Sequence, residues 1–332
     1  MHMADALVTP AVAGTMYVCS AAAAAYSVKR IRHENDPKKI PVMGVMGAFV
    51  FAAQMINFTI PGTGSSGHLC GGMLLSSMLG PCAGFLTMIS VLLIQCLLFA
   101  DGGLLALGCN VWNMAFYGCF IGSFFVWRPL MHKGASKAKI ILASVLGCVA
   151  TLQLGALSVT LETLASGITE LPFGVFVATM QPIHLAIGCV EGLITAAVLV
   201  FVHGARPELL YGTNETQDGN SRFTFGKTLV ILAVVTVLVG GVLSLFASAN
   251  PDGLEWAMER VAGTSELEAV GGVYDAAAAA QEATSLLPDY AIKGSDSTWG
   301  TALSGIVGSL AVLVVCLGVC KAFRFFGKKK TA

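Results

Sequence analysis

The sequence predicts an all-α polytopic membrane protein, on the basis of three observations. Of its 332 residues, 55% are hydrophobic and only 11% are charged, and the mean hydropathy is +0.77. An ordinary soluble domain has about 25% charged residues, and a water-soluble protein of this composition would have nowhere to bury its apolar surface. The apolar residues also form long runs separated by short polar segments, which is the pattern of membrane-spanning helices.

Nine segments are predicted to be membrane helices, because a bilayer core of about 30 Å requires about 20 apolar residues per helix. The third segment is short. The first is expected to remain attached to the protein, since no basic residues precede it as they do in a cleavable signal peptide. The segments are residues 10–28, 41–58, 69–80, 82–100, 104–127, 139–165, 173–203, 228–248 and 300–322.

The nine segments divide into two predicted domains. Seven spans form the first domain, residues 1–210, and two spans form a hairpin in the second, residues 227–332. Residues 211–226, rich in Gly, Thr, Asn and Asp, are predicted to be a cytoplasmic linker. The hairpin encloses an acidic outer loop, residues 249–298, with nine acidic and two basic residues and a net charge of −7. The alanine-rich residues 276–280 are compatible with a short helix or a flexible stretch.

The basic residues predict the orientation, because positively charged loops remain in the cytoplasm. If every segment crosses once and the N-terminus is outside, 17 of the 19 basic residues lie on the inner side. The sequence thus predicts a multi-pass protein of the cell (inner) membrane with its C-terminus in the cytoplasm. Omitting the third span would place the basic loops of the two halves on opposite sides. The 17 residues are Lys29, Arg30, Arg32, Lys38, Lys39, Arg128, Lys133, Lys137, Lys139, Arg206, Arg222, Lys227, Lys321, Arg324, Lys328, Lys329 and Lys330.

The sequence lacks the common motifs of membrane enzymes and ATPases. The chain has no Gly-x-x-x-x-Gly-Lys-Ser/Thr loop for nucleotide phosphates and no His-Glu-x-x-His pair for catalytic zinc. Its ten cysteines lie in or beside apolar runs without a Cys-x-x-Cys pair, so we interpret them as small buried residues. Any ATP hydrolysis linked to this chain is therefore expected to come from a separate subunit.

The first two residues are candidate metal ligands. Methionine is normally retained before a large second residue, so Met1 is expected to keep a free amine in front of His2. The amine, the next amide nitrogen and the imidazole can close two small chelate rings on one ion and present three nitrogens in a plane. Tetragonal nitrogen ligation favours Cu(II) or Ni(II). On the dipeptide alone, the alternative that His2 is an ordinary tail residue stays open.

A fourth nitrogen is available from His68. It lies in the segment PGTGSSGHLCGG, residues 61–72, at the predicted outer end of the short third span. A Gly/Ser-rich segment allows irregular backbone to line a cavity at membrane depth. A lone histidine at a membrane edge is commonly just a satisfied polar group. However, the predicted topology places Met1, His2 and His68 on the same side, and together they predict a metal site.

Four separated motifs carry a family resemblance: residues 1–5 (MHMAD), 51–69, 101–114 (DGGLLALGCNVWNM) and 184–196 (HLAIGCVEGLITA). They resemble the M subunit, the substrate-specificity component, of the cobalt/nickel energy-coupling factor (ECF) transporters, the CbiM/NikM family. In the second domain, PDGLEW at residues 251–256 resembles the signature of the two-span N subunit, the PDGLE domain. The chain therefore resembles an M–N fusion.

The resemblance implies a seven-helix bundle like that of ECF substrate-specificity components, followed by the two-helix hairpin. It implies that Met1, His2 and His68 bind Ni²⁺ or Co²⁺ as the transported substrate, and the ligand geometry leans slightly to nickel. It also implies partners in the lipid bilayer, namely a transmembrane coupling protein and two ABC ATPase subunits that drive release inward. No organic cofactor and no nucleic acid are expected. A membrane metal sensor or channel, or less favourably a membrane metalloenzyme, is the alternative.

Four amides in apolar segments, Gln54, Asn57, Asn110 and Asn113, allow two interpretations. They can join helices, at about 0.6–2 kcal/mol per hydrogen bond. They can also orient His68 and the N-terminal segment, because metal-bound histidines usually donate their second ring N–H to such a partner.

Two ionisable residues in the seventh span, His184 and Glu191, lie two helical turns apart on one face. They are expected either to pair or to belong to the route of the metal toward the cytoplasm, because ionisable residues inside a membrane are costly and usually functional. Glu162 is expected to be solvated. Asp5 can either balance the charge of the cation or cap the first helix, and we expect the cap, because helix N-termini favour carboxylates.

Overall fold

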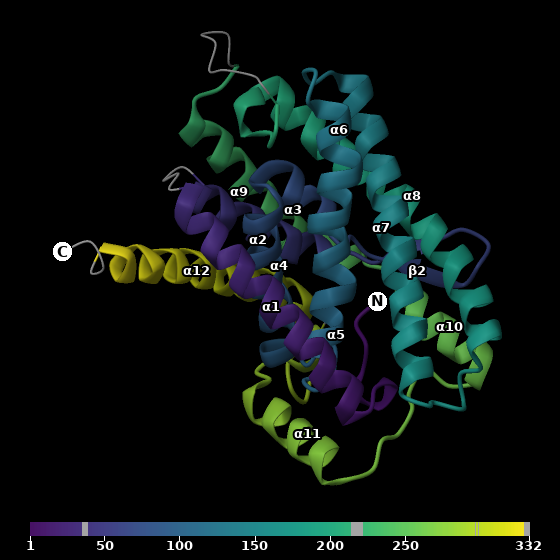
Figure 1. Cartoon of the computed structure of the whole chain (residues 1–332). Helices are drawn as coiled ribbons and strands as arrows, with labels where there is room; N and C mark the ends of the chain where they lie inside the picture. Colours follow the sequence, from purple (N-terminus) through teal and green to yellow (C-terminus); the bar gives the residue numbers. More distant parts are fainter. Residues whose placement is uncertain (35–38, 214–221, 296, 298, 329–332) are drawn as a thin grey trace.

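The computed structural model describes residues 1–34, 39–213, 222–295, 297 and 299–328, and within these ranges it is almost entirely helical (Figure 1). Two short antiparallel strands form its one described sheet, with Phe58 opposite Gly67. The elements, in order, are η1 (Asp5–Leu7), α1 (Pro10–Glu34), α2 (Lys39–Gln54), β1 (Phe58–Ile60), β2 (Ser65–Gly67), α3 (Gly72–Leu79), α4 (Pro81–Phe99), α5 (Leu107–Asn110), η2 (Val111–Trp127), α6 (Arg128–Met131), α7 (Lys137–Ala165), α8 (Phe173–Ala205), η3 (Pro207–Leu209), α9 (Phe225–Gly241), η4 (Leu243–Phe246), α10 (Gly253–Ala262), α11 (Gly272–Thr284), η5 (Pro288–Tyr290) and α12 (Trp299–Lys328).

Each of the nine predicted segments contains helix. Among the described residues, seven helical segments are long and apolar enough to cross a membrane, with α5, η2 and α6 forming one continuous segment. The other two are shorter than predicted. The helix α2 ends at Gln54, and α3 has only 8 residues, or about 12 Å at 1.5 Å per residue. The Gly/Ser-rich residues before α3 form the β1–β2 hairpin and an irregular segment instead of helix.

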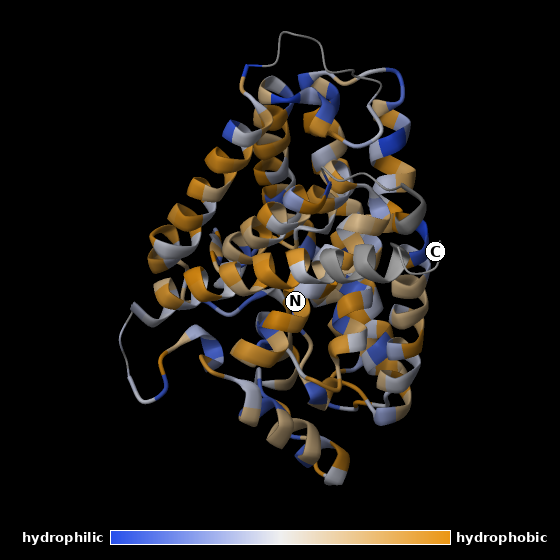
Figure 2. Ribbon diagram, turned by 90° about the vertical axis from the view of Figure 1, so that its left-hand side faces the viewer, coloured by the Kyte–Doolittle hydropathy of each residue, from blue (hydrophilic) through white to orange (hydrophobic). Residues whose placement is uncertain are grey.

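The outer faces of the bundle are apolar. Large hydrophobic side chains are exposed along α7 and α9, among them Leu146, Leu161, Val230, Val234 and Val237. Hydrophobic residues fill the middle of the helices, whereas hydrophilic residues collect toward the ends (Figure 2). A contiguous apolar surface of this extent is unsuitable for water and suits contact with lipid.

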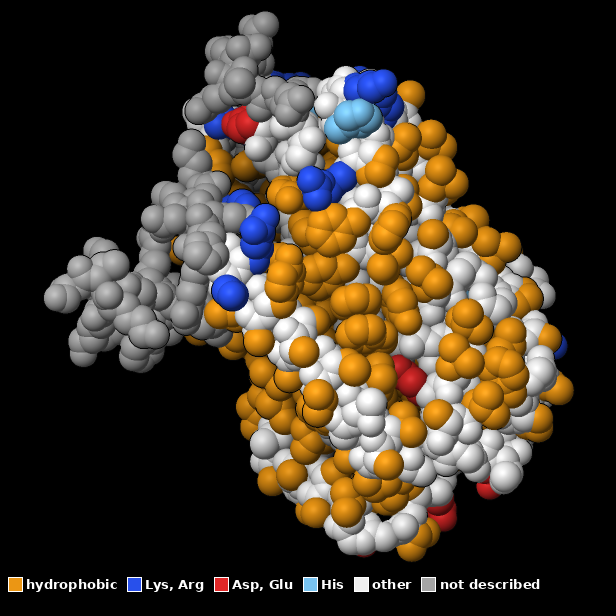
Figure 3. Space-filling model, viewed as in Figure 1, with side chains coloured by type: hydrophobic (Ala, Val, Ile, Leu, Met, Phe, Trp, Pro, Cys, Tyr) orange, Lys and Arg blue, Asp and Glu red, His pale blue; other side chains and the backbone are white. Residues whose placement is uncertain are grey.

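The described basic residues lie mainly at one end of the molecule, and the helices of the acidic loop lie at the other end. Most described Lys and Arg side chains lie in the half that contains α6, and α10 and α11 lie at the opposite end (Figures 1 and 3). The side chains of Arg32, Lys38 and the five C-terminal basic residues lie outside the described part, as does most of the predicted linker at 214–221. The separation agrees with the expected inner and outer ends, and the orientation itself stays a prediction.

The second domain packs against the first through small residues on α2. A side chain at Gly44 would lie 2.8 Å from Leu313, and one at Gly47 would lie 3.0 Å from Val312, both on α12. The absence of these side chains lets the two helices approach closely, as is common between helices in lipid. This contact joins α12 of the second domain to α2 of the first domain.

Candidate metal centre

The N-terminal segment is folded into the bundle and held by Asn110. The Met3 N–H donates to Asn110 Oδ1 at 2.7 Å, and the Asn110 side-chain amide donates back to the Met3 carbonyl at 3.1 Å. The Gly103 N–H donates to the same carbonyl at 2.8 Å. Met3 itself has no exposed surface. Asn110, one of the four predicted amides, therefore fixes the segment that carries Met1 and His2.

The Gly102-Gly103 turn is shaped to accept this segment. Gly102 has a positive φ of 77°, and a β-carbon at Gly103 would lie 2.5 Å from the Asp5 backbone nitrogen. Since the contact is with backbone, rotation of a side chain cannot relieve it. These positions therefore require glycine if the N-terminal segment is to stay in place.

Gly103→Ala is accordingly expected to displace the N-terminal segment and to weaken Ni²⁺ binding by about 10- to 100-fold, the usual effect of disturbing groups that orient metal ligands. Titration calorimetry on the purified chain measures the change. Gly174→Ala is the matched control, since a β-carbon there meets nothing within 4 Å. Equal affinities of the two variants would show that the turn does not position the ligands.

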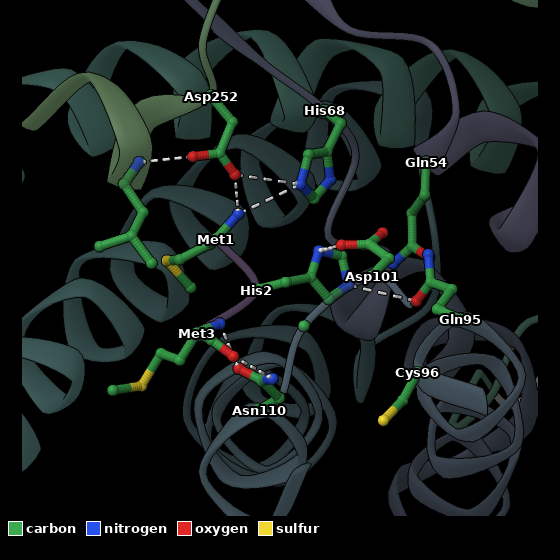
Figure 4. A network of polar contacts seen from close by, with 12 residues as sticks. Met1, His2, Met3, Gln54, His68, Gln95, Cys96, Asp101, Asn110 and Asp252 are labelled. Carbon is green, nitrogen blue, oxygen red and sulfur yellow. Dashed lines mark hydrogen bonds and ion pairs between the residues drawn. The ribbon is translucent and has the colours of Figure 1, made fainter. Parts of the chain in front are cut away.

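The β1–β2 hairpin and the irregular segment after it place His68. Its Nδ1 lies 3.0 Å from the Leu69 carbonyl, and since a carbonyl only accepts, the proton is on Nδ1 and Nε2 keeps its lone pair. That Nε2 lies 3.2 Å from the Met1 nitrogen (Figure 4). Burial, and then the Met1 ammonium, lower the pKa of His68 to about 4. His68 is therefore neutral at pH 7, the form that binds metals.

The three predicted ligands lie together. The His2 and His68 rings stack with their centroids 5.4 Å apart and an angle of 22° between them. Two nitrogens bound side by side to one ion, at about 2 Å each, lie about 2.8 Å apart. The 3.2 Å between Met1 N and His68 Nε2 is close to this separation. The Met1 nitrogen and His68 Nε2 can therefore bind one ion.

His2 is oriented by two residues that were not predicted, Gln95 and Asp101. Gln95 donates to Gln54 Oε1 at 2.9 Å, and its own oxygen lies 3.2 Å from His2 Nε2. With the proton on Nε2, His2 Nδ1 is the nitrogen that can close the chelate. It lies 3.2 Å from Asp101 Oδ1, and because a carboxylate only accepts, this contact is favourable only while Nδ1 also carries a proton. The ion must therefore displace that proton to close the chelate. Gln54 acts through Gln95 and also donates to the Cys70 carbonyl at 2.8 Å.

The acidic loop of the second domain reaches this site with Asp252. This residue caps α10, where its Oδ1 accepts from the N–H groups of Leu254 and Glu255 at 2.7 and 3.0 Å. Its Oδ2 pairs with the Met1 amine and lies 3.8 Å from His68 Nε2. Burial opposes the charged forms of both groups, but their pairing raises the pKa of the Met1 amine and holds that of Asp252 well below its usual range.

A second residue of this loop acts on Asp101. The Tyr290 hydroxyl donates to Asp101 Oδ2, and the Tyr290 ring stacks on Phe99 at 4.9 Å. Tyr290 belongs to η5, so the second domain contributes to the orientation of His2 as well. The sequence contained a signal for Asp252 in the PDGLE motif, but no local pattern identified Tyr290.

Two expectations about acidic residues are wrong. Glu162 is buried, and it accepts from the side-chain amide of Asn113 at 2.7 Å and from the Ser158 hydroxyl at 3.3 Å. Burial is possible because Glu162 lies on the inward face of α7, where Asn113 of η2 supplies a hydrogen-bond donor, whereas Leu161 and Leu164 beside it are exposed. Asp5 does not cap α1: its Oδ1 accepts from the Ala106 N–H at 2.9 Å, at the start of α5.

The remaining predicted residues lie around the ligands without touching them. Asn57 lines the cavity in front of the site, and its backbone carbonyl accepts from Ser248 at 2.7 Å. His184 Nδ1 donates to the Met180 carbonyl at 2.8 Å, and Glu191 accepts from the Gly71 N–H at 2.9 Å. Among the hydrogen bonds of the described residues, none joins His184 to Glu191, so the expected pair does not form.

A cavity of about 880 Å³ opens onto the ligands between the two domains. His2 and His68 form part of its wall, and its lining contains no Lys or Arg among the described residues. A cleft of one charge sign raises the local concentration of counter-ions. Its acidic lining residues are Asp5, Asp101, Asp252, Glu255, Glu266, Asp275 and Asp289.

The candidate centre depends on backbone nitrogens. Within the described residues, no three His, Cys, Asp or Glu side chains come together in a way that could hold a metal ion. None of the nine cysteines whose side chains the structure describes forms a disulfide with another of them, and all but Cys19 and Cys189 are buried. The Met1 amine and the His2 amide are thus essential to a site at this position.

Comparisons with known proteins agree with this chemistry. The family model "Cobalt uptake substrate-specific transmembrane region" matches residues 2–209, and the PDGLE domain model matches residues 226–325. The chain is 36% identical to the Archaeoglobus fulgidus protein named "Putative fused nickel transport protein NikMN", over 98% of this chain and 99% of that protein. It is 30% identical to the fused nickel transport protein NikMN of Rhodobacter capsulatus, over 63% and 64%. The crystal structure of a truncated transition metal transporter matches with a TM-score of 0.53 and 30% identity, over 61% of this chain and 98% of that one.

Proposed function

Because the chain belongs to the cobalt-uptake substrate-specific transmembrane (CbiM) family and carries a fused PDGLE domain, we propose that it is the metal-binding membrane component of an ECF-type transporter for Ni²⁺ or Co²⁺. The observation that carries the proposal is the contact at 3.2 Å between the Met1 nitrogen and His68 Nε2, beside the stacked ring of His2. These groups supply the nitrogen donors that late divalent metals prefer.

In this function, the metal enters the acidic cavity and is bound by four nitrogens. The Met1 amine, the His2 amide and His2 Nδ1 belong to the N-terminal chelate, and His68 Nε2 is the fourth. The amine must be free of any preceding residue, and it must lose its proton to bind, as must the amide. Asn110, Gln95 and Gln54 support this arrangement because they hold the segment and the His2 ring.

Release toward the cytoplasm is assigned to partner subunits. The chain contains no phosphate-binding loop, so a coupling protein and two ABC ATPases supply the energy. We place the cavity on the outer side, in agreement with the charge distribution. His184 and Glu191 are candidates for the inward route, because His184 lines a space of about 20 Å³ next to Met1 and His68, and Glu191 contacts the backbone of Gly71 at the start of α3.

The proposal is tested by titrating the purified chain, with Met1 as its first residue, with Ni²⁺, Co²⁺ and Mg²⁺. We expect one high-affinity site for Ni²⁺ or Co²⁺ and none for Mg²⁺, which prefers oxygen ligands in an octahedral arrangement. Preference for Mg²⁺, or no saturable binding of the two transition metals, would contradict the proposed function.

A further inference from the structure

We propose that Asp252, in the second domain, is a further donor to the bound metal, so that the two domains share one coordination sphere. The inference rests on the proposed function and extends it, because the ligand set predicted from the sequence comes entirely from the first domain. Asp252 caps α10 and at the same time points a carboxylate oxygen at two predicted metal ligands, Met1 and His68.

The separations of the donor atoms support this assignment. Asp252 Oδ2, Met1 N and His68 Nε2 all lie within 3.8 Å of one another. Atoms bound to one ion at about 2 Å lie between about 2.8 Å and 4 Å apart, depending on the angle between the bonds. A metal bound to the amine and to His68 is therefore within reach of this oxygen. Figure 4 shows the carboxylate and the two nitrogens facing the same point.

The two oxygens of Asp252 have separate roles. Oδ1 accepts both N–H groups at the start of α10, and the Asp252 N–H in turn donates to Glu255 at 2.9 Å. This capping box fixes the rotation of the carboxylate. Oδ2 is left directed at Met1 and His68, so no rearrangement of the side chain is needed for it to bind a metal.

The backbone before Asp252 is held by the hairpin that also positions His68. Ser66 in β2 donates to the Pro251 carbonyl through its N–H at 2.8 Å and to the Asn250 carbonyl through its hydroxyl, also at 2.8 Å. The Trp256 ring N–H donates to the Thr63 carbonyl at the hairpin turn at 3.0 Å. Since His68 follows β2 directly, the same strand sets the position of both residues relative to each other.

The charge of the complex also requires an anion at this place. A divalent ion bound by a neutral amine, one deprotonated amide and two neutral imidazoles keeps a net charge of +1. The site is enclosed, with His68 10% and Asp252 14% exposed, and an uncompensated charge in such a place is costly. A fifth donor that is a carboxylate neutralises the complex.

The test is Asp252→Asn in the full chain, because asparagine caps a helix as well as aspartate does but is a much poorer metal donor. The matched control is Glu259→Gln, which makes the same change on an exposed residue of the same helix. We expect Asp252→Asn to weaken Ni²⁺ binding at least about tenfold, and Glu259→Gln to leave it unchanged. Unchanged or tighter binding in Asp252→Asn would overturn the assignment, and tighter binding would identify Asp252 as a competitor of the metal for the amine.

X-ray absorption at the nickel edge provides a second readout that does not depend on affinity. Planar four-coordinate nickel has a resolved 1s-to-4p pre-edge feature, which a fifth ligand suppresses. We expect this feature to be weak in the unaltered chain and strong in Asp252→Asn. A planar signature in the unaltered chain would overturn the assignment and leave the proposed function intact, whereas absence of binding by the unaltered chain would contradict the proposed function and with it the role of Asp252.

Discussion

Insertion of two glutamines between Met1 and His2, which are large enough for Met1 to be retained, is expected to abolish high-affinity Ni²⁺ binding, with a loss of more than about 1,000-fold, because changes to supporting residues alone cost about 10- to 100-fold. Two residues span up to about 7 Å of chain, so the amine can no longer share one chelate with the His2 ring beside His68. The insertion is measured by calorimetric titration of the purified variant.

The number of inserted residues matters. One added residue would create an amine, two amides and an imidazole in sequence, which is a four-nitrogen chelate that needs no His68. Two glutamines inserted after Gly134, where a β-carbon would meet nothing within 4 Å, are the matched control and are expected to leave binding intact. High affinity that survives the insertion between Met1 and His2 would show that the amine and His2 do not act as one chelate.

His68→Ala is expected to weaken Ni²⁺ binding by about 100-fold or more. Loss of a residue that only supports a ligand lowers metal affinity by up to about 100-fold, and loss of the ligand itself should cost at least as much. Residual weak binding is expected to persist, because all three nitrogens of the N-terminal chelate remain. Titration of His132→Ala serves as the control for loss of an imidazole, as His132 is exposed and follows α6 at the opposite end of the molecule. Equal Ni²⁺ affinities of the two variants would show that His68 is not a ligand of the metal.

The membrane fold could be predicted from the sequence because hydropathy reports directly on burial in lipid. The two largest differences lie in α2 and α3, where glycine, serine and asparagine follow or interrupt the apolar run. A hydropathy window counts apolar residues, but it does not detect that Gly62 and Gly64 adopt positive φ and turn the chain into a hairpin. The family membership inferred from the motifs is confirmed by the matches to both family models.

The candidate site could be predicted only in part. Met1, His2 and His68 were identified because their chemistry is local: one dipeptide and one histidine in a glycine-rich segment. Asp252 and Tyr290 were not, because they reach the site from the second domain through contacts 251 and 189 residues apart in the chain. No hydropathy pattern or residue spacing in the sequence indicates such a long-range contact. The PDGLE motif did identify the segment, but its aspartate was counted only as part of the loop's charge.

The surroundings of two acidic residues, Glu162 and Asp5, were predicted wrongly. Glu162 was expected in solvent because it lies near a helix end, yet it is buried against Asn113. Asp5 was expected to cap the helix that follows it in sequence, yet it accepts from Ala106, about 100 residues later. In both cases the partner lies on another helix, so the outcome depended on tertiary packing that sequence position alone does not determine.

The most direct test of metal binding by the N-terminus is a crystal structure of the nickel-loaded chain with Met1 as its first residue, in which an anomalous difference map locates the metal. We predict one strong peak bonded to the Met1 amine, the His2 amide and Nδ1, and His68 Nε2. A peak bound only by carboxylates of the outer loop, or a peak beside His68 without the Met1 amine, would contradict the central claim that the N-terminus itself binds the transported metal.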